Sequence, residues 1–151
     1  MNTAQLVKLL TARGETLSCA ESLTVGLLCD AVVQVPGASK CFMGGIVAYD
    51  EGRKVTLLDV PQSTLDAHSA VSRETALAMA RGARERLQTT FSLSTTGYAG
   101  PDGDDVGLVW LGYAGPDGTD VRECRFSGSR EEIRRQAVQS ALAFLAEKLF
   151  Q

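Results

Sequence analysis

The sequence has few of the features that mark several common protein classes. Its 15 Lys and Arg residues are fewer than its 18 Asp and Glu residues, which leaves a net charge of −3. The basic residues are scattered, apart from the pair Arg134–Arg135. A surface for a nucleic acid backbone is basic, so we expect no nucleic acid partner. A local Arg or Lys with backbone N–H groups is still enough to bind one phosphate.

Cysteine, histidine and long apolar runs are also scarce. The four cysteines form no C-x-x-C pair, so the sequence offers no zinc or thioredoxin-like motif and predicts no metal site. No apolar run approaches the roughly 20 residues that cross a bilayer. The first residues lack a basic segment followed by an apolar one, so we expect a cytoplasmic protein with reduced thiols. The single histidine, His68, has no evident triad partner, which favours lysine as the base in any serine chemistry.

The chain has the size and composition of one globular domain. Its 151 residues are 44% hydrophobic and 22% charged, and no linker or low-complexity stretch divides them. Helical and strand patterns alternate in the first half, and a hairpin follows in the second. The sequence therefore predicts a single domain over residues 1–151 with an α/β fold, in which a mixed sheet is flanked by helices in three layers, α/β/α.

Two segments place hydroxyl groups where a predicted strand meets a helix or turn. Residues 16–20 read as a strand and 24–33 as a helix, so Ser22 and Thr24 lie at a junction that favours an anion. Both residue types are also common helix caps, and spacing alone favours that role. Thr96 ends a predicted strand before the glycine-rich turn 97–103, which lacks the lysine of a P-loop and the spacing of a dinucleotide fingerprint.

A third group surrounds the predicted strand 41–49. Ser39 precedes this strand, Tyr49 ends it and Lys54 follows it. A lysine that is partly withdrawn from water can act as the base for a serine nucleophile. From spacing alone, the commoner interpretation is a turn serine, a half-buried tyrosine and a solvated lysine. Near the last helix, Arg130 is placed to bind a phosphate or to pair with Glu131.

These segments, taken in order, resemble the C-terminal CinA family over nearly the whole chain. The resemblance lies in Ala-Glu-Ser at 20–22, Pro-Gly-Ala-Ser at 36–39, Val-Ala-Tyr at 47–49 with Lys54, and the motifs at 68–72, 96–103 and 127–130. It implies a homo-oligomer, a dimer or higher, that hydrolyses nicotinamide mononucleotide to nicotinic acid mononucleotide and ammonia without a metal or other cofactor. The resemblance is to the stand-alone form of the family, which we expect this chain to be.

The resemblance also assigns roles to residues. It implies Ser39, Lys54, Tyr49 and Ser22 as catalytic residues, with Ser39 attacking the carboxamide and Lys54 as its base, although Ser22 could be the nucleophile instead. The substrate-binding residues that it implies are Thr96, Gly97, Gly100, Arg130, Thr24 and Gly26.

Three departures from the family pattern bear on this reading. Val25 stands where the family has a glycine, Asp50–Glu51 place two carboxylates beside Lys54, and the turn after Gly103 is short. The carboxylates are expected to raise the pKa of Lys54. Two alternatives therefore stay open: a paralogue that binds a nucleotide or is purely structural, and a hydrolase of another small amide.

Overall fold

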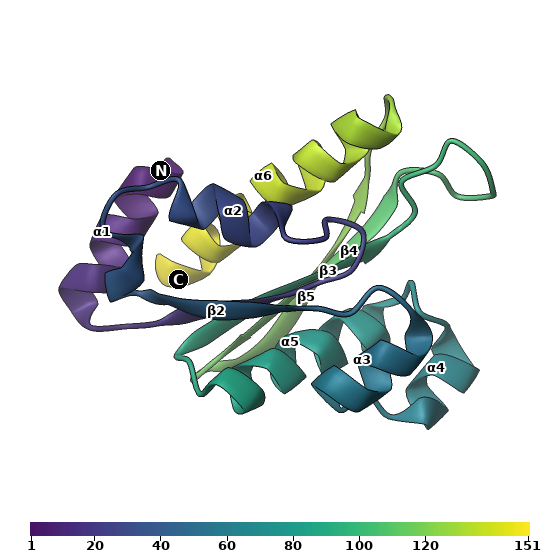
Figure 1. Ribbon diagram of the computed structural model, residues 1–151, viewed down its shortest axis with the longest axis horizontal. Coiled ribbons are helices and arrows are strands. Elements are labelled where there is room, and N and C mark those ends of the chain that lie inside the picture. The colour runs from purple at the N-terminus through teal and green to yellow at the C-terminus, as the bar shows by residue number, and fades with distance from the viewer.

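Five strands form one sheet, and six α-helices cover its two faces, in a computed structural model that describes residues 1–151 (Figure 1). Helices α1, α2 and α6 lie on one face, and α3, α4 and α5 lie on the other. The predicted α/β fold with three layers is confirmed. In chain order the elements are α1 (Thr3–Arg13), β1 (Leu17–Glu21), α2 (Leu27–Val33), the short 3-10 helix η1 (Ala38–Lys40), β2 (Phe42–Val47), α3 (Glu51–Leu58), α4 (Gln62–His68), α5 (Arg73–Leu87), β3 (Phe91–Gly97), β4 (Leu108–Gly115), β5 (Gly118–Arg125) and α6 (Arg130–Leu149).

The sheet is mixed, with strand order β2-β1-β3-β4-β5. Strand β1 pairs in parallel with both β2 and β3, whereas β4 and β5 are antiparallel to their neighbours. The chain leaves β1 toward β2 on one side and later returns to β3 on the other. The carboxyl end of β1 is thus a point where the direction of winding changes, the usual place for a ligand in an open α/β sheet.

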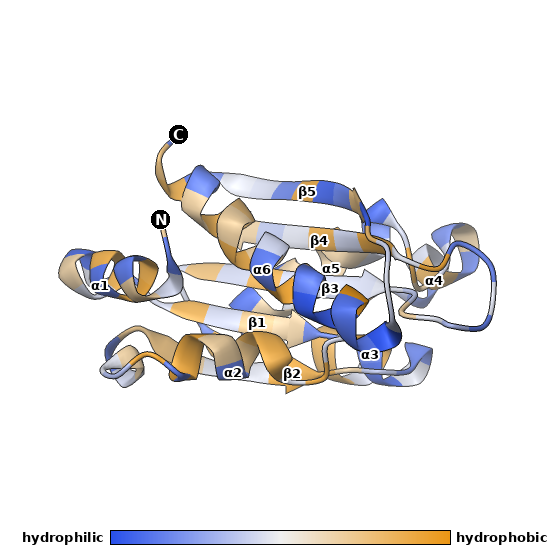
Figure 2. Ribbon diagram, turned by 90° about the horizontal axis from the view of Figure 1, so that it is seen from above, coloured by the Kyte–Doolittle hydropathy of each residue, from blue (hydrophilic) through white to orange (hydrophobic).

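The apolar side chains form two cores, one on each face of the sheet. A cluster of 24 buried residues fills the space under α1, α2 and α6, and a smaller cluster of seven lies under α3, α4 and α5. Helices α1 and α6 carry alternating hydrophobic and hydrophilic segments, the pattern of helices with one buried side (Figure 2). None of the helices combines the length and apolar character that a bilayer crossing requires.

Most predicted helix ends are confirmed, but the start of α2 is not. Ser72 and Ser129 cap α5 and α6 through their side chains, and Gly14 ends α1 in the left-handed conformation. Helix α2 begins three residues later than predicted, at Leu27, and its N-cap is Gly26 with φ of 92°. The hydroxyl of Thr24 does not cap the helix because it bonds to the side chains of neighbouring buried residues instead.

Candidate active site

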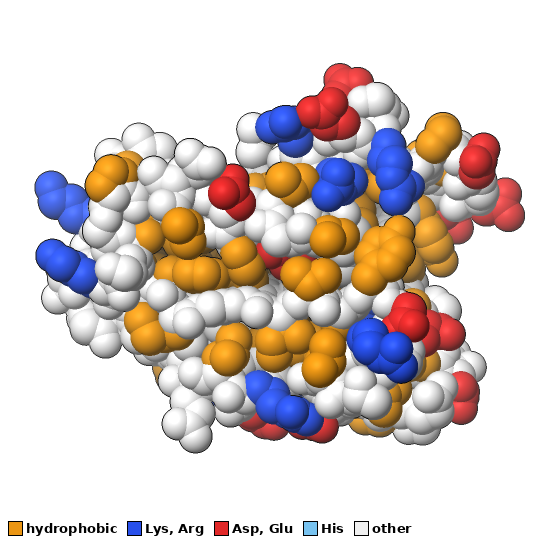
Figure 3. All heavy atoms as spheres, viewed as in Figure 1, with side chains coloured by type: hydrophobic (Ala, Val, Ile, Leu, Met, Phe, Trp, Pro, Cys, Tyr) orange, Lys and Arg blue, Asp and Glu red, His pale blue; other side chains and the backbone are white.

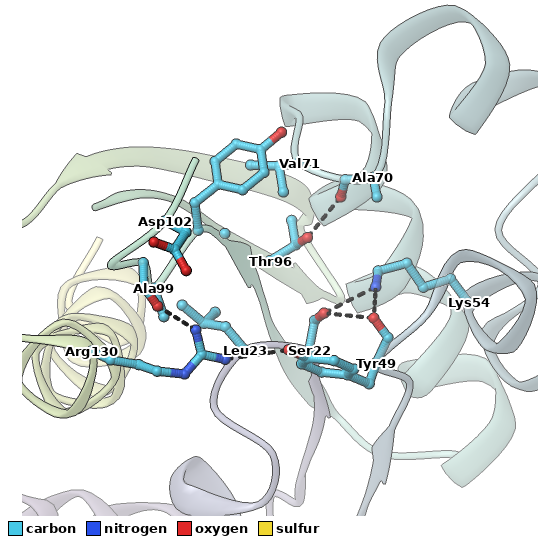
Figure 4. A pocket seen from close by; sticks show the side chains of 13 residues that line it. Ser22, Leu23, Tyr49, Lys54, Ala70, Val71, Thr96, Ala99, Asp102 and Arg130 are labelled. Atoms are coloured by element: carbon cyan, nitrogen blue, oxygen red, sulfur yellow. Dashed lines mark hydrogen bonds between the residues drawn. The ribbon is translucent and has the colours of Figure 1, made fainter. Parts of the chain in front are cut away.

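The candidate site is a pocket of about 400 Å³ at the carboxyl ends of β1, β2 and β3 (Figure 4). Its volume falls within the range of roughly 300–1,000 Å³ that small-molecule sites occupy. The polar side chains that line it come from five separate segments, which the parallel strands bring to one edge of the sheet. They are Ser22, Tyr49, Lys54, Thr96, Tyr98, Asp102 and Arg130.

Lys54 is the most unusual residue of this pocket, because its side chain is buried with only 2% of its surface exposed. It reaches from α3 toward the end of β1, where its Nζ lies 2.9 Å from the Oγ of Ser22. The Nζ also donates to two backbone carbonyls that follow β2, those of Ala48 at 3.1 Å and Tyr49 at 3.0 Å. The lysine is therefore held at a fixed position beside a serine hydroxyl.

Lys54 donates all three of these hydrogen bonds, so Ser22 Oγ and the two carbonyls match the three N–H donors of an ammonium group. The Ser22 hydroxyl itself donates to the carbonyl of Tyr49 at 3.5 Å. When the amine loses its proton, the two carbonyls can keep both remaining N–H groups, which leaves the lone pair facing Ser22. Burial lowers the pKa of Lys54, while the carboxylates of Asp50 and Glu51 raise it. The direction predicted for the two carboxylates is confirmed, but burial is the larger effect, so the net pKa is lowered.

Ser22 stands directly after β1 and is 6% exposed. Its backbone N–H donates to the carbonyl of Thr95 at 3.0 Å, which fixes the turn against the neighbouring strand β3. Below it, the buried carboxylate of Glu21 accepts from the Thr24 hydroxyl at 2.6 Å and from the backbone N–H groups of Leu28 and Cys29. The position of Ser22 thus depends on the hydrogen bonds that the Glu21 carboxylate accepts beneath the turn.

The predicted contact between Ser39 and Lys54 is wrong. Ser39 is exposed on η1, ahead of β2, whereas Lys54 lies beyond the far end of that strand. A six-residue strand separates its two ends by about 20 Å at a rise of roughly 3.3 Å per residue. Ser39 does not line the pocket, and the serine beside Lys54 is Ser22.

Two predicted substrate-binding residues also lie outside the pocket. Thr24 is fully buried and bonds to Glu21 and Thr95, so its hydroxyl supports the turn from below. Gly26 serves as the N-cap of α2, and its positive φ is the conformation that glycine adopts at low cost. Neither residue lines the pocket.

The remaining predicted residues do line the pocket. The Thr96 hydroxyl donates to the carbonyl of Ala70 at 2.7 Å, which ties β3 to the loop before α5. At Gly97 a Cβ atom would lie 2.7 Å from the carbonyl oxygen of Leu108, so the pairing of β3 with β4 requires glycine there. Arg130 donates to the carbonyl of Gly100 and, at 3.3 Å, to the Tyr49 hydroxyl. Figure 4 shows this guanidinium group on the side of the pocket opposite Lys54.

The sequence prediction missed several residues that line the pocket. Asp102 belongs to the glycine-rich turn 97–103, and its place in that turn was the available signal. Leu23 follows the predicted Ser22, but an apolar side chain carries no chemical signal of its own. The prediction also missed Arg134, which lies outside the pocket and supports the Ser22 turn by donating to the carbonyl of Leu23 at 2.8 Å. Its sequence pattern resembles that of any solvent-exposed arginine of a helix.

His68 and the cysteines lie away from these side chains. The Nδ1 of His68 is 3.6 Å from a carboxylate oxygen of Glu74, and neither residue lines the pocket. The four cysteines are free thiols, and none of them lines the pocket. No group of three or more His, Cys, Asp or Glu side chains is arranged to hold a metal ion.

Comparison with known proteins places this geometry in a family. The model of the CinA C-terminal domain matches residues 2–149. The chain belongs to the CinA family. It is 47% identical over 150 residues to a CinA-like protein of Cyanothece sp., covering 95% of this chain and 36% of the relative. A CinA-like protein of Dictyoglomus thermophilum is 40% identical over 148 residues, with the same two coverages. The chain thus spans about 36% of the length of these CinA relatives.

Solved structures of CinA-family proteins share the whole fold. The competence/damage inducible protein CihA of Agrobacterium tumefaciens superimposes with a TM-score of 0.93 at 36% identity, covering 96% of this chain and 92% of that one. The competence damage-inducible protein A of Klebsiella pneumoniae gives a TM-score of 0.94 at 33% identity, covering 100% and 99%. The names of these relatives state no reaction.

Proposed function

We propose that this CinA-family chain is a serine amidohydrolase in which Ser22 is the nucleophile and Lys54 is its base. The observation that carries the proposal is the 2.9 Å contact between the Ser22 hydroxyl and a buried lysine amine. A nucleophile and its base need to be within about 2.6–3.2 Å. The lowered pKa of Lys54, caused mainly by burial, increases the fraction of uncharged amine near neutral pH.

The proposed reaction runs in two halves. In the first, the Ser22 hydroxyl passes its proton to Lys54 as its oxygen forms a bond to the amide carbon, and the C=O electron pair moves onto the carbonyl oxygen. When the carbonyl re-forms, the C–N bond breaks and the Lys54 ammonium gives its proton to the departing nitrogen, which leaves as ammonia. In the second half, Lys54 takes a proton from water as the water oxygen forms a bond to the acyl carbon. When the carbonyl re-forms, the C–O bond to Ser22 breaks, the Lys54 ammonium returns its proton to the Ser22 oxygen, and the acid leaves.

The proposed substrate is nicotinamide mononucleotide, which is the substrate that the family resemblance implies. The pocket offers suitable groups for the carboxamide, the phosphate and the pyridine ring of this molecule. Ser22 and Lys54 lie at one end, where a carboxamide would react, and Arg130 lies at the other, where its guanidinium could pair with a phosphate. Tyr49 lines the pocket and is 58% exposed as a residue, so its ring is available as an aromatic face for a pyridine ring.

Ammonia release from nicotinamide mononucleotide by the purified protein tests this function. We expect turnover by the parent protein and by Ser39→Ala, and about 1,000-fold slower turnover by Ser22→Ala or Lys54→Ala. Ser39→Ala is a matched control because it removes the same hydroxyl from an exposed position outside the pocket. Binding without turnover in the parent would identify a binding module instead, and turnover of other carboxamides alone would identify a different amidase.

The predicted homo-oligomer also stays a proposal, and edge strand β2 is the surface that supports it. Met43, Val47 and Tyr49 alternate along one side of this strand and its continuation and are 48%, 43% and 58% exposed. Hydrophobic side chains gather across the face of the molecule that shows this strand (Figure 3). An apolar, unpaired edge strand is a common contact surface between copies of a chain. Light scattering of the parent and of Val47→Lys tests it, and an unchanged mass would exclude this surface.

A further inference from the structure

The turn after β1 contains two backbone N–H groups that find no acceptor in the chain. Within it, the N–H of Ser22 donates to Thr95 at 3.0 Å and that of Val25 donates to the carbonyl of Ser22 at 3.2 Å. The N–H groups of Leu23 and Thr24 donate to nothing. These two residues are only 4% and 0% exposed. Buried backbone donors without a partner are rare in proteins, so a pair of them beside a nucleophile requires an explanation.

The carbonyls of the same two residues are held from the opposite side. Arg134 of α6 donates through Nε to the carbonyl of Leu23 at 2.8 Å and through Nη2 to that of Thr24 at 3.3 Å. In a trans peptide the C=O and the following N–H point in opposite directions, so the bond to the Leu23 carbonyl aims the Thr24 N–H away from α6. A charged donor on the carbonyl also polarises that peptide group, which makes its N–H a stronger donor.

The chemistry of the proposed reaction needs donors at this place. When the Ser22 oxygen attacks an amide carbon, the carbonyl oxygen takes up negative charge, and preorganised N–H groups stabilise that charge. Many serine hydrolases use the backbone N–H of the residue that follows the nucleophile. Leu23 holds that position here and lines the pocket next to Ser22.

We propose that the backbone N–H of Leu23, the residue of this turn that follows Ser22 and lines the pocket, is a donor of the oxyanion hole, and that Arg134 is the positioning residue that fixes the turn through the carbonyls of Leu23 and Thr24. The inference rests on the proposed serine chemistry and extends it. It assigns a role in the reaction to an arginine outside the pocket and to a peptide segment whose side chains have no part in the chemistry.

Replacing the Leu23 amide by an ester, through incorporation of leucic acid, tests the first part directly. This change removes the N–H and keeps the side chain. We expect kcat to fall by about 100- to 1,000-fold, the usual effect of losing one oxyanion donor, with KM within threefold of the parent. The matched control is the ester at Val25, which removes a turn hydrogen bond but no proposed donor. A Leu23 ester that keeps at least a third of the parent kcat would overturn the oxyanion hole. A Val25 ester whose kcat falls as far as that of the Leu23 ester would overturn it too.

Arg134→Met and Arg134→Lys test the second part. We expect Arg134→Met to lower kcat by tenfold or more with little change in KM, and Arg134→Lys to restore part of the loss because lysine can still donate to one carbonyl. A purely structural arginine would instead change the melting temperature alone. That result would remove Arg134 from the proposal.

Acylation of Ser22 by p-nitrophenyl acetate, followed by mass spectrometry, separates this inference from the proposed substrate. We expect the parent protein to be acylated at Ser22 and the Leu23 ester to be acylated about 100-fold more slowly. Acylation at equal rates would overturn the oxyanion hole while leaving the nucleophile in place. A parent that is acylated but releases no ammonia from nicotinamide mononucleotide would overturn only the substrate, and a parent that is not acylated would overturn both proposals.

Discussion

The contact between Ser22 and Lys54 leads to a sharp prediction for a double-mutant cycle. Because the Ser22 hydroxyl and the Lys54 amine are 2.9 Å apart and share one proton, each needs the other to react. Ser22→Ala removes the nucleophile, and Lys54→Met removes the base while keeping a side chain of similar length. Either change alone should abolish the same proton transfer, so the double variant should be no slower than the slower single variant.

The size of this effect follows from ordinary general-base contributions. A well-placed base accelerates a reaction by about 10²–10⁴-fold, so we expect each single variant to lose about 10³-fold in kcat/KM. Two independent losses would multiply to about 10⁶-fold, which is about 8 kcal/mol of barrier. Two residues that act as one unit would instead lose about 10³-fold together, or about 4 kcal/mol. The two models therefore differ by about 4 kcal/mol, far more than the error of a rate measurement.

The assay is ammonia release by the four proteins under the same conditions, with circular dichroism to show that each is folded. The fold check matters because Lys54→Met leaves the carbonyls of Ala48 and Tyr49 without their donor, at a cost of about 1–3 kcal/mol per buried group. Ser39→Ala serves as the control and should stay within twofold of the parent. Multiplicative losses in the double variant, or a large loss in Ser39→Ala, would refute the pairing of Ser22 with Lys54.

Four other results follow from the structure. Since burial lowers the pKa of Lys54, the rate should rise with pH through a midpoint below the usual lysine range, and a midpoint at or above that range would contradict a buried base. The folded state also binds the Lys54 proton less tightly than the unfolded chain does, so the free energy of unfolding should rise with pH between the folded and unfolded pKa values of Lys54. Urea titrations should show this rise in the parent and not in Lys54→Met. Val25 has a φ of 42°, which is strained for a β-branched residue, so Val25→Gly should raise the melting temperature by a few degrees, and a lower one would show that the strain is absent. Arg130→Met should raise KM for a mononucleotide by tenfold or more while leaving binding of free nicotinamide unchanged, which calorimetry can measure.

The site shows where reasoning from local sequence fails. Ser22 and Ser39 both precede Lys54 in the sequence, and Ser39 is the closer of the two along the chain. The structure reverses this order because β2 runs between Ser39 and Lys54 and puts them at its opposite ends, while parallel pairing of β1 with β2 brings Ser22 beside the residues that follow β2. Contact between these residues depends on strand direction, which no local pattern records.

The sequence by itself determined the elements of this protein and the kinds of chemical groups it carries. Periodicity and capping residues predicted most helices and strands, because hydrophobic spacing and caps such as Ser72 and Ser129 act over a few residues. Only the tertiary structure decided which serine meets the lysine, that Lys54 is buried enough for a lowered pKa, and that Arg134 holds the turn after β1. Each of these depends on groups brought together from distant parts of the chain, since burial and orientation arise only when the helices and the sheet pack.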